Sequence, residues 1–208
     1  NTTGSENTAV GKNALGSNTT GTENVAIGKG AYGGTTGSQN TVVGQGAMDG
    51  VNTGNNNTAI GRYALLSNTS GASNTAVGLS ALQANTTAAN NTAVGLTALS
   101  ANTTGASNVA VGADAGAAVT TGDNNIFLGH STGVSASPGG AITTGSNEIV
   151  LGNSSITEAH IKVDWTVSSD ERDKTDFTAL DIGLNFINDL EPLTYKWDKR
   201  ADYVNWKN

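Results

Sequence analysis

The residue types that could perform chemistry lie near the C-terminus, in the charged run Ser169-Asp-Glu-Arg-Asp-Lys174. A serine hydroxyl and a lysine amine can act together, because burial lowers the pKa of a lysine until it accepts the hydroxyl proton. Spacing alone favours a plainer interpretation, in which Asp170 to Lys174 form a solvated turn that enters the terminal segment. Both interpretations stay open at this point.

Other residues with chemical potential are scattered along the chain. His130 and His160 are isolated in the sequence, so we expect surface or packing roles for them rather than metal binding. The chain has no cysteine, which excludes a disulfide framework and a thiolate metal site. We therefore predict no metal site and no cofactor. Asn-x-Ser/Thr sequons are explained better by repeated turn chemistry than by glycosylation. They occur at Asn1, Asn18, Asn68, Asn85, Asn102 and Asn153.

Composition and charge limit the partners. Only 5% of the 208 residues are aromatic and 13% are charged, so the bulky side chains of an ordinary globular core are missing. The net charge is -7, and the first 152 residues contain only Lys12, Lys29 and Arg62 as cations. Nucleic-acid binding needs clustered cations, and crossing a bilayer needs about 20 consecutive apolar residues. We expect neither a nucleic-acid partner nor membrane insertion.

Residues 1–152 are built from one short repeat. Asn, a small or β-branched residue, Ala or Val, an aliphatic residue and Gly recur with terminal glycines at 11, 28, 44, 61, 78, 95, 112 and 129, spaced 17, 16, 17, 17, 17, 17 and 17 residues apart. A second apolar residue, preceded by Ala, follows four positions later, and then a turn rich in Asn, Thr and Gly. These second apolar residues are Leu15, Tyr32, Met48, Leu65, Leu82 and Leu99. Short runs of Val, Ile and Thr bounded by Gly and Asn predict strands rather than helices.

A single repeat cannot fold alone, because ordering its backbone costs about 1–2 kcal/mol per residue and it buries only two small apolar patches. Stacked repeats pair their backbones about 4.8 Å apart, with apolar columns and ladders of asparagine amides between equivalent positions. The alanines suit a narrow interior. We therefore predict an all-β fold, a repetitive β-solenoid of the β-roll or β-helix type with 17-residue coils.

The Asn-Thr-Ala-Val-Gly repeats resemble those of phage tail fibres and, more distantly, the head repeats of trimeric autotransporter adhesins. The resemblance implies a homotrimeric structural component of a virion tail fibre or an extracellular surface filament. Its partners would be further copies of itself, other fibre or baseplate proteins and, for host attachment, a cell-surface glycan or receptor. The repeats show no acid/base constellation, cofactor cradle or aromatic sugar platform. An adhesin or ice-binding array remains an alternative, based on Thr8, Thr41, Thr58, Thr75 and Thr92.

Composition changes after residue 152, since residues 153–208 hold 18 of the 27 charged residues and all three tryptophans. We expect residues 153–168 to cap the solenoid, with one or two strands between Ile156 and Val167. For residues 169–208 we predict a small α+β segment, with a helix from about Leu180 to Leu190 and a strand from Leu193 to Trp197.

The charged run, together with residues 187–197, resembles the start of the C-terminal intramolecular chaperone of endosialidases and other phage fibres. The resemblance implies a segment, incomplete here, that trimerises, templates folding of the stalk before it and then cuts itself off. Ser169 would be the nucleophile and Lys174 its general base, while Asp170 and Arg172 would shape the turn, with cleavage between Ser169 and Asp170. A self-cleaving serine peptidase module is thus an alternative function.

Overall fold

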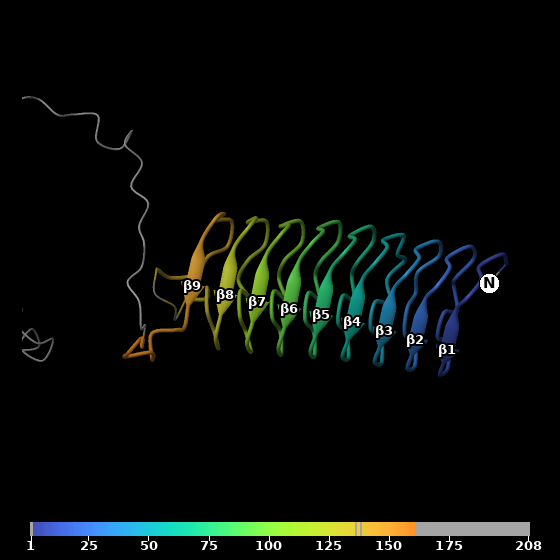
Figure 1. Cartoon of the computed structure of the whole chain (residues 1–208), viewed down its shortest axis with the longest axis horizontal. Helices are drawn as coiled ribbons and strands as arrows, with labels where there is room; N and C mark the ends of the chain where they lie inside the picture. The colour runs from blue at the N-terminus through green and yellow to red at the C-terminus, as the bar shows by residue number, and fades with distance from the viewer. Residues whose placement is uncertain (1, 136, 138, 161–208) are drawn as a thin grey trace, which may run out of the picture. The chain divides into compact units, whose positions relative to one another are not determined.

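The computed structural model describes residues 2–135, 137 and 139–160, and these residues form a β-solenoid, as predicted (Figure 1). The chain divides into two units, Asn1–His160 and Ile161–Asn208, and the solenoid belongs to the first. Each coil contributes one three-residue strand to a single sheet, whose strands follow chain order. The strands are β1 (Thr8–Val10), β2 (Val25–Ile27), β3 (Thr41–Val43), β4 (Thr58–Ile60), β5 (Thr75–Val77), β6 (Thr92–Val94), β7 (Val109–Val111), β8 (Ile126–Leu128) and β9 (Ile149–Leu151).

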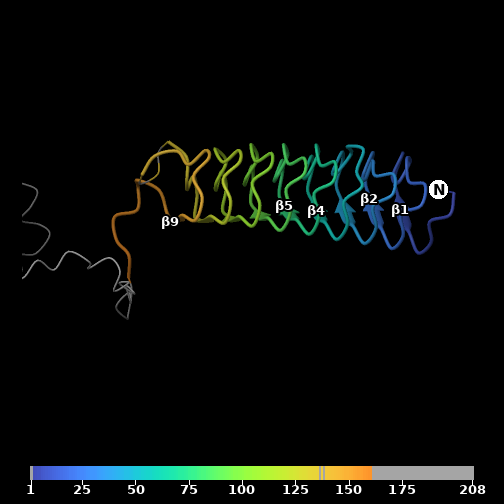
Figure 2. The ribbon, with the colours of Figure 1, turned by 90° about the horizontal axis from the view of Figure 1, so that it is seen from above.

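The coils stack one after another along the solenoid (Figure 2), and equivalent residues of successive strands lie in register. Every neighbouring pair of strands is parallel, and β4 pairs with β5 through Thr58 and Thr75, Ala59 and Ala76, and Ile60 and Val77. Backbone bonds continue beyond the strands, since the Gly78 N–H donates to the Ile60 carbonyl at 2.8 Å. The predicted stacking of repeats is therefore confirmed.

The core consists of two facing columns of side chains, which together form one thin layer. The middle residue of each strand points inward and is Ala in most coils, and Ala59, Ala76 and Ala93 are all 0% exposed. Opposite them lie Leu65, Leu82 and Leu99, which are also fully buried. Pairing a small residue with a large one keeps the coil narrow and leaves no void, as close packing requires.

The leucine column adopts a backbone conformation that leucine rarely adopts. Leu65, Leu82 and Leu99 have φ of 52°, 51° and 50°. A left-handed conformation of a non-glycine residue costs on the order of 1 kcal/mol, and it persists here because inter-coil bonds fix it. The Leu65 N–H, for example, donates to the Ala81 carbonyl at 3.0 Å. These positive φ values turn the chain sharply after each strand.

Asparagine side chains form a ladder just before the strands, as we predicted. Asn74 is buried, its Nδ2 donates to Asn57 Oδ1 at 3.2 Å and to the Ala88 carbonyl at 2.8 Å, and its Oδ1 accepts the Asn91 N–H at 3.0 Å. Each amide therefore satisfies backbone groups that the turn leaves without partners, which stabilises the turn.

A second asparagine ladder lies in the turn after the leucine column. Asn85 Nδ2 donates to Asn68 Oδ1 at 2.9 Å, and Asn102 Nδ2 donates to Asn85 Oδ1 at 3.1 Å. The next coil has Val119 in this position, fully buried, and the ladder ends at Asn102. Because these sequon asparagines are enclosed, a structural role explains them better than glycosylation.

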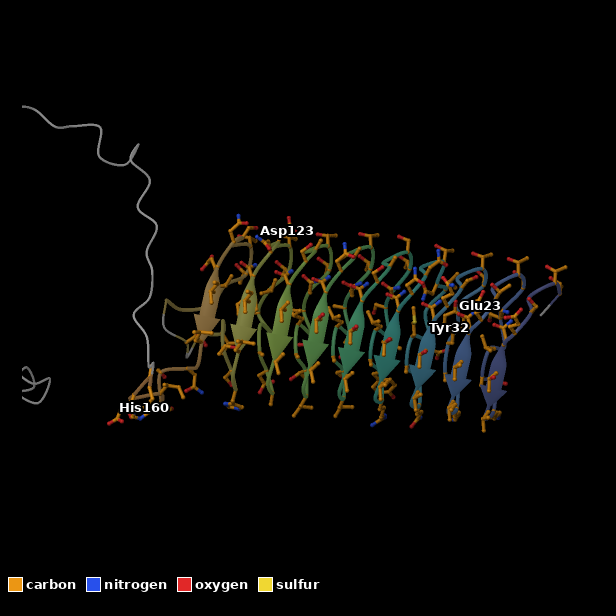
Figure 3. The ribbon with its side chains drawn as sticks, in the orientation of Figure 1. Glu23, Tyr32, Asp123 and His160 are labelled. Carbon is orange, nitrogen blue, oxygen red and sulfur yellow. The ribbon has the colours of Figure 1, made fainter. Side chains whose placement is uncertain are left out.

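Tyr32, labelled in Figure 3, substitutes for the second ladder in a coil that lacks its asparagine. Its hydroxyl donates to the Gly37 carbonyl at 2.8 Å, as Asn68 Nδ2 does to the Gly71 carbonyl at 2.9 Å. The ring needs the space beside Gly34, where a Cβ atom would lie 2.3 Å from Cζ of the ring. Burial raises the pKa of Tyr32 to about 12, while the hydrogen bond from Asn40 acts in the opposite direction.

Most of the predicted cap lies outside the described residues. Residues 156–160 contain no strand, and they are only the first part of the interval from Ile156 to Val167 in which we expected one or two strands. The remainder of that interval, the helix predicted from Leu180 to Leu190 and the strand from Leu193 to Trp197 lie outside the described residues. The predictions of a capping segment at 153–168 and of an α+β segment at 169–208 stay untested.

Candidate functional site

The predicted catalytic residues Ser169, Asp170, Arg172 and Lys174 lie outside the described residues, so their mutual geometry stays a prediction. Within the described residues, the feature that stands out is a surface rather than a cleft. It is the outer face of the sheet, which the first and third residues of each strand form because side chains alternate along a strand.

The third strand residues make an exposed apolar column that runs the length of the solenoid. Every member is Val, Ile or Leu, and most are substantially exposed, from 37% at Val94 to 57% at Val10. The column consists of Val10, Ile27, Val43, Ile60, Val77, Val94, Val111, Leu128 and Leu151. Figure 3 shows how these strands lie side by side on one face. We call this column the apolar stripe.

An apolar stripe of this length is unusual on a surface that faces only water. Isolated exposed apolar residues are ordinary, whereas contiguous apolar patches mark interaction surfaces. The in-register stacking makes the patch contiguous, because each residue lies directly beside its equivalent in the next strand. Sequence analysis identified apolar columns but did not place this one outside the core, since the strand direction alone does not tell which face is covered.

The first strand residues form a mixed column on the same outer face. Threonine occupies this position in β1, β3, β4, β5 and β6, and Val25, Val109, Ile126 and Ile149 interrupt it. The interruptions are apolar, so they widen the apolar stripe in β2 and in the three strands β7 to β9. The threonine array proposed for ice or adhesin binding stays a prediction.

Another row of threonines donates hydrogen bonds to backbone carbonyls of the next coil. Thr69 Oγ1 donates to the Thr86 carbonyl at 3.0 Å, and Thr86 Oγ1 donates to the Thr103 carbonyl at 3.0 Å. Thr103 continues the row by donating to the Thr120 carbonyl at 2.9 Å. The sequence signal for this row was the Asn-Thr-Thr turn, which we interpreted only as turn chemistry.

The two histidines have carboxylate neighbours that sequence spacing did not reveal. His130 Nε2 lies 4.0 Å from Asp114 Oδ2 of the coil before, and His160 Nε2 lies 3.2 Å from Glu158 Oε2. Both pairs are largely exposed, which makes each worth less than about 1 kcal/mol. In residues 2–135, 137 and 139–160, no three or more His, Asp or Glu side chains gather into a group that could hold a metal ion.

The comparison with known families concerns the segment that follows the solenoid. Its match begins at Ser169, the first residue of the charged run, and ends at residue 207. Residues 169–207 match the family described as the chaperone of endosialidase. A segment similar to the chaperone of endosialidase thus follows the β-solenoid in the chain, as the two resemblances together predicted.

No curated protein and no solved structure matches the chain. The stalk is therefore characterised by its own geometry. Over the part of the chain that the structure describes, no helix is long and apolar enough to cross a membrane.

Proposed function

We propose that this chain is the shaft of a homotrimeric fibre, in a viral tail or an extracellular surface filament, and that the chaperone-of-endosialidase segment assembles it. The apolar stripe carries the proposal. It runs along nine strands and is exposed in most of them, which fits a partner of the same length and the same repeat, and a second and third copy of the chain are such partners.

The family match supports the same assembly. A chaperone segment after a repetitive stalk suits a fold whose coils cannot form alone, because a trimer at one end holds three chains together while the first coils stack. The stacked coils then extend from that end. This scheme gives the stalk a mechanical role, with host attachment at its surface and other fibre or baseplate proteins at its ends.

Oligomeric state tests the proposal directly. Size-exclusion chromatography with light scattering of the full chain should give about three times the 20.8 kDa of one chain. Val77→Lys combined with Val94→Lys should reduce that mass, because the two charges would be buried in the interface without partners. Thr87→Lys with Thr104→Lys, at exposed turn positions, is the matched control and should remain trimeric. A monomeric native chain, or an unchanged trimer in the stripe variant, would contradict this assembly.

Self-cleavage is the second candidate function, and the start of the family match at Ser169 favours it. In this proposal Lys174 takes the hydroxyl proton of Ser169, and the peptide bond between Ser169 and Asp170 is broken with the addition of water. Intact mass spectrometry of the protein expressed from its full reading frame should then show a product that ends at Ser169. The Ser169→Ala variant of the same protein should keep its full mass. Identical masses in both proteins would remove the cleavage chemistry and leave the shaft proposal unaffected.

A further inference from the structure

A shallow hollow of about 320 Å³ lies at the edge of the sheet where β1 to β4 end. In the second position after each repeat glycine, other coils carry a side chain, such as Asn13, Tyr63 and Ser80, but two coils have Gly30 and Gly46. All of these residues have φ near +60°, so the backbone path does not change. The hollow therefore exists because two consecutive side chains are absent from an otherwise continuous column.

An aromatic ring forms one wall of the hollow. A Cβ atom on Gly46 would lie 2.9 Å from Cδ1 and Cε1 of Tyr63, so the ring lies against that glycine. The Arg62 guanidinium carbon lies 4.4 Å from the centre of the Tyr63 ring, and Arg62 Nη2 donates to the Tyr63 hydroxyl at 2.8 Å. Arginine thus fixes the ring, while its own charge stays at the rim.

The cations of the repeats occupy one position of the coil, and one of them, Lys29, lines this hollow. Lys12, Lys29 and Arg62 occupy the same position of the coil, directly after the repeat glycine, and they are the only Lys or Arg residues among the first 152. Figure 3 shows Asp123 at the opposite edge of the sheet, where the strands begin. Within the described residues, ion pairs within 4.0 Å involve only the two histidines. Lys29 in the lining and Arg62 beside Tyr63 therefore have no carboxylate partner within 4.0 Å among these residues, in a chain whose net charge is -7.

The other side chains that line the hollow can form hydrogen bonds with hydroxyl groups of a ligand. Asn13 and Gln45 offer amide donors and acceptors, and the Asp49 carboxylate offers acceptors only. All three residues are exposed, so a ligand can reach them without displacing protein groups. A flat aromatic face together with amides and a carboxylate fits a pyranose ring, which presents C–H groups on one face and hydroxyls at its edge.

From these features we propose that the hollow binds an acidic saccharide. The sugar ring would lie on Tyr63, its carboxylate or sulfate would face Lys29 and Arg62, and its hydroxyls would bond to Asp49 and Gln45. This inference rests on the proposed role of the chain as a fibre shaft and specifies where that shaft attaches. Our expectation that the repeats contain no aromatic sugar platform stays a prediction that the titration below tests, since only the register of coils brings Tyr63 beside Gly46.

Calorimetric titration of the full chain tests the site with four probes, namely a trigalacturonate, a sialylated trisaccharide, a sulfated disaccharide and neutral lactose. At least one acidic probe should bind, lactose should bind more weakly, and the affinity should fall as salt increases. Lys29→Gln with Arg62→Gln should weaken binding by about tenfold or more, since two charge-assisted contacts are lost. Equal binding of lactose and the acidic probes, or unchanged affinity in this variant, overturns the proposal.

A second variant fills the hollow without changing charge. Gly30→Asn should abolish binding, and the position tolerates it because Asn13 has φ of 61° in the equivalent place and a Cβ on Gly30 meets only the Asp49 carboxylate, at 3.5 Å. Ser80→Asn, in the same column outside the hollow, and Lys12→Gln, outside the lining, should bind like the native chain. If either control loses binding as fully as Gly30→Asn, the ligand binds elsewhere and the site is wrong.

Light scattering on the same samples separates this inference from the shaft proposal. A trimer that binds no acidic probe overturns the saccharide site and leaves the shaft standing. A monomer that binds an acidic probe, with the variant pattern above, supports the site and overturns the shaft.

Discussion

The aromatic ring of Phe127 occupies the space that a side chain at Gly133 would need. A Cβ atom on Gly133 would lie 2.3 Å from Cε1 of the ring, and one on Gly116 of the coil before would lie 2.8 Å from Cδ2. In most other coils the strand residue is Ala and the opposite residue is large. This coil reverses the arrangement, with the large residue in the strand and glycines opposite, so the core stays filled.

The reversal predicts how the three positions depend on one another. Phe127→Ala should destabilise the stalk by about 3–5 kcal/mol, because it leaves a cavity beside two glycines. The triple variant Gly116→Leu, Phe127→Ala and Gly133→Leu restores the common arrangement and should recover much of that loss, since Gly116 and Gly133 have φ of 61° and 71°, near the 50° of Leu99. Thermal unfolding, monitored by circular dichroism, measures the loss in Phe127→Ala and its recovery in the triple variant. A triple variant no more stable than Phe127→Ala would show that the positions are independent.

Tyr32 predicts a loss of stability at alkaline pH. Burial raises the pKa of its hydroxyl to about 12 in the folded chain, whereas an exposed tyrosine has a pKa of about 10. The unfolded chain therefore ionises first, and the stabilisation present below pH of about 10 is lost progressively up to pH of about 12. The midpoint of urea unfolding, measured across this range, should decrease more steeply in the native chain than in Tyr32→Phe.

Tyr32→Phe should also lower the stability of the stalk at neutral pH. It removes the hydroxyl that donates to the Gly37 carbonyl and accepts from Asn40 Nδ2 at 3.1 Å, and it should cost about 1–2 kcal/mol. Lysines titrate over the same alkaline range, and the comparison between the two proteins cancels their contribution. Parallel pH profiles would contradict the assignment of the effect to Tyr32.

The asparagine ladder predicts strong sensitivity to a change of one atom. Asn74→Asp replaces an amide that donates to Asn57 Oδ1 and the Ala88 carbonyl with a group that only accepts when ionised. Burial disfavours the charged carboxylate, so the loss should reach about 3 kcal/mol or more at pH 7 and become smaller in acid, where the carboxyl is protonated. Asn90→Asp, the exposed neighbour with φ of 60°, is the matched control and should change stability little. Equal losses in both variants would mean that the ladder contributes nothing specific.

Particular residues show how far sequence reasoning extended. The spacing of the repeat glycines, and the pairing of Ala with Leu15, Leu65 and equivalent residues, predicted stacked coils, and the structure confirms them. The roles of Tyr32 and Phe127 could not be predicted, because each ring lies against a glycine only after the chain has turned. Hydropathy did not separate Val94 and Val111, which are exposed, from buried apolar residues, since an alternating three-residue strand shows no preferred face.

For this protein, the sequence alone determined the period, the strand type and the similarity of residues 169–207 to the chaperone of endosialidase, because identical short units are unstable unless they stack and because a charged signature is local. Tertiary structure decided which columns face water and which side chains meet across coils. Register brought Arg62 and Tyr63 beside Gly46 and placed Asp114 near His130, and such contacts depend on the exact stacking of coils that lie about 17 residues apart in the chain.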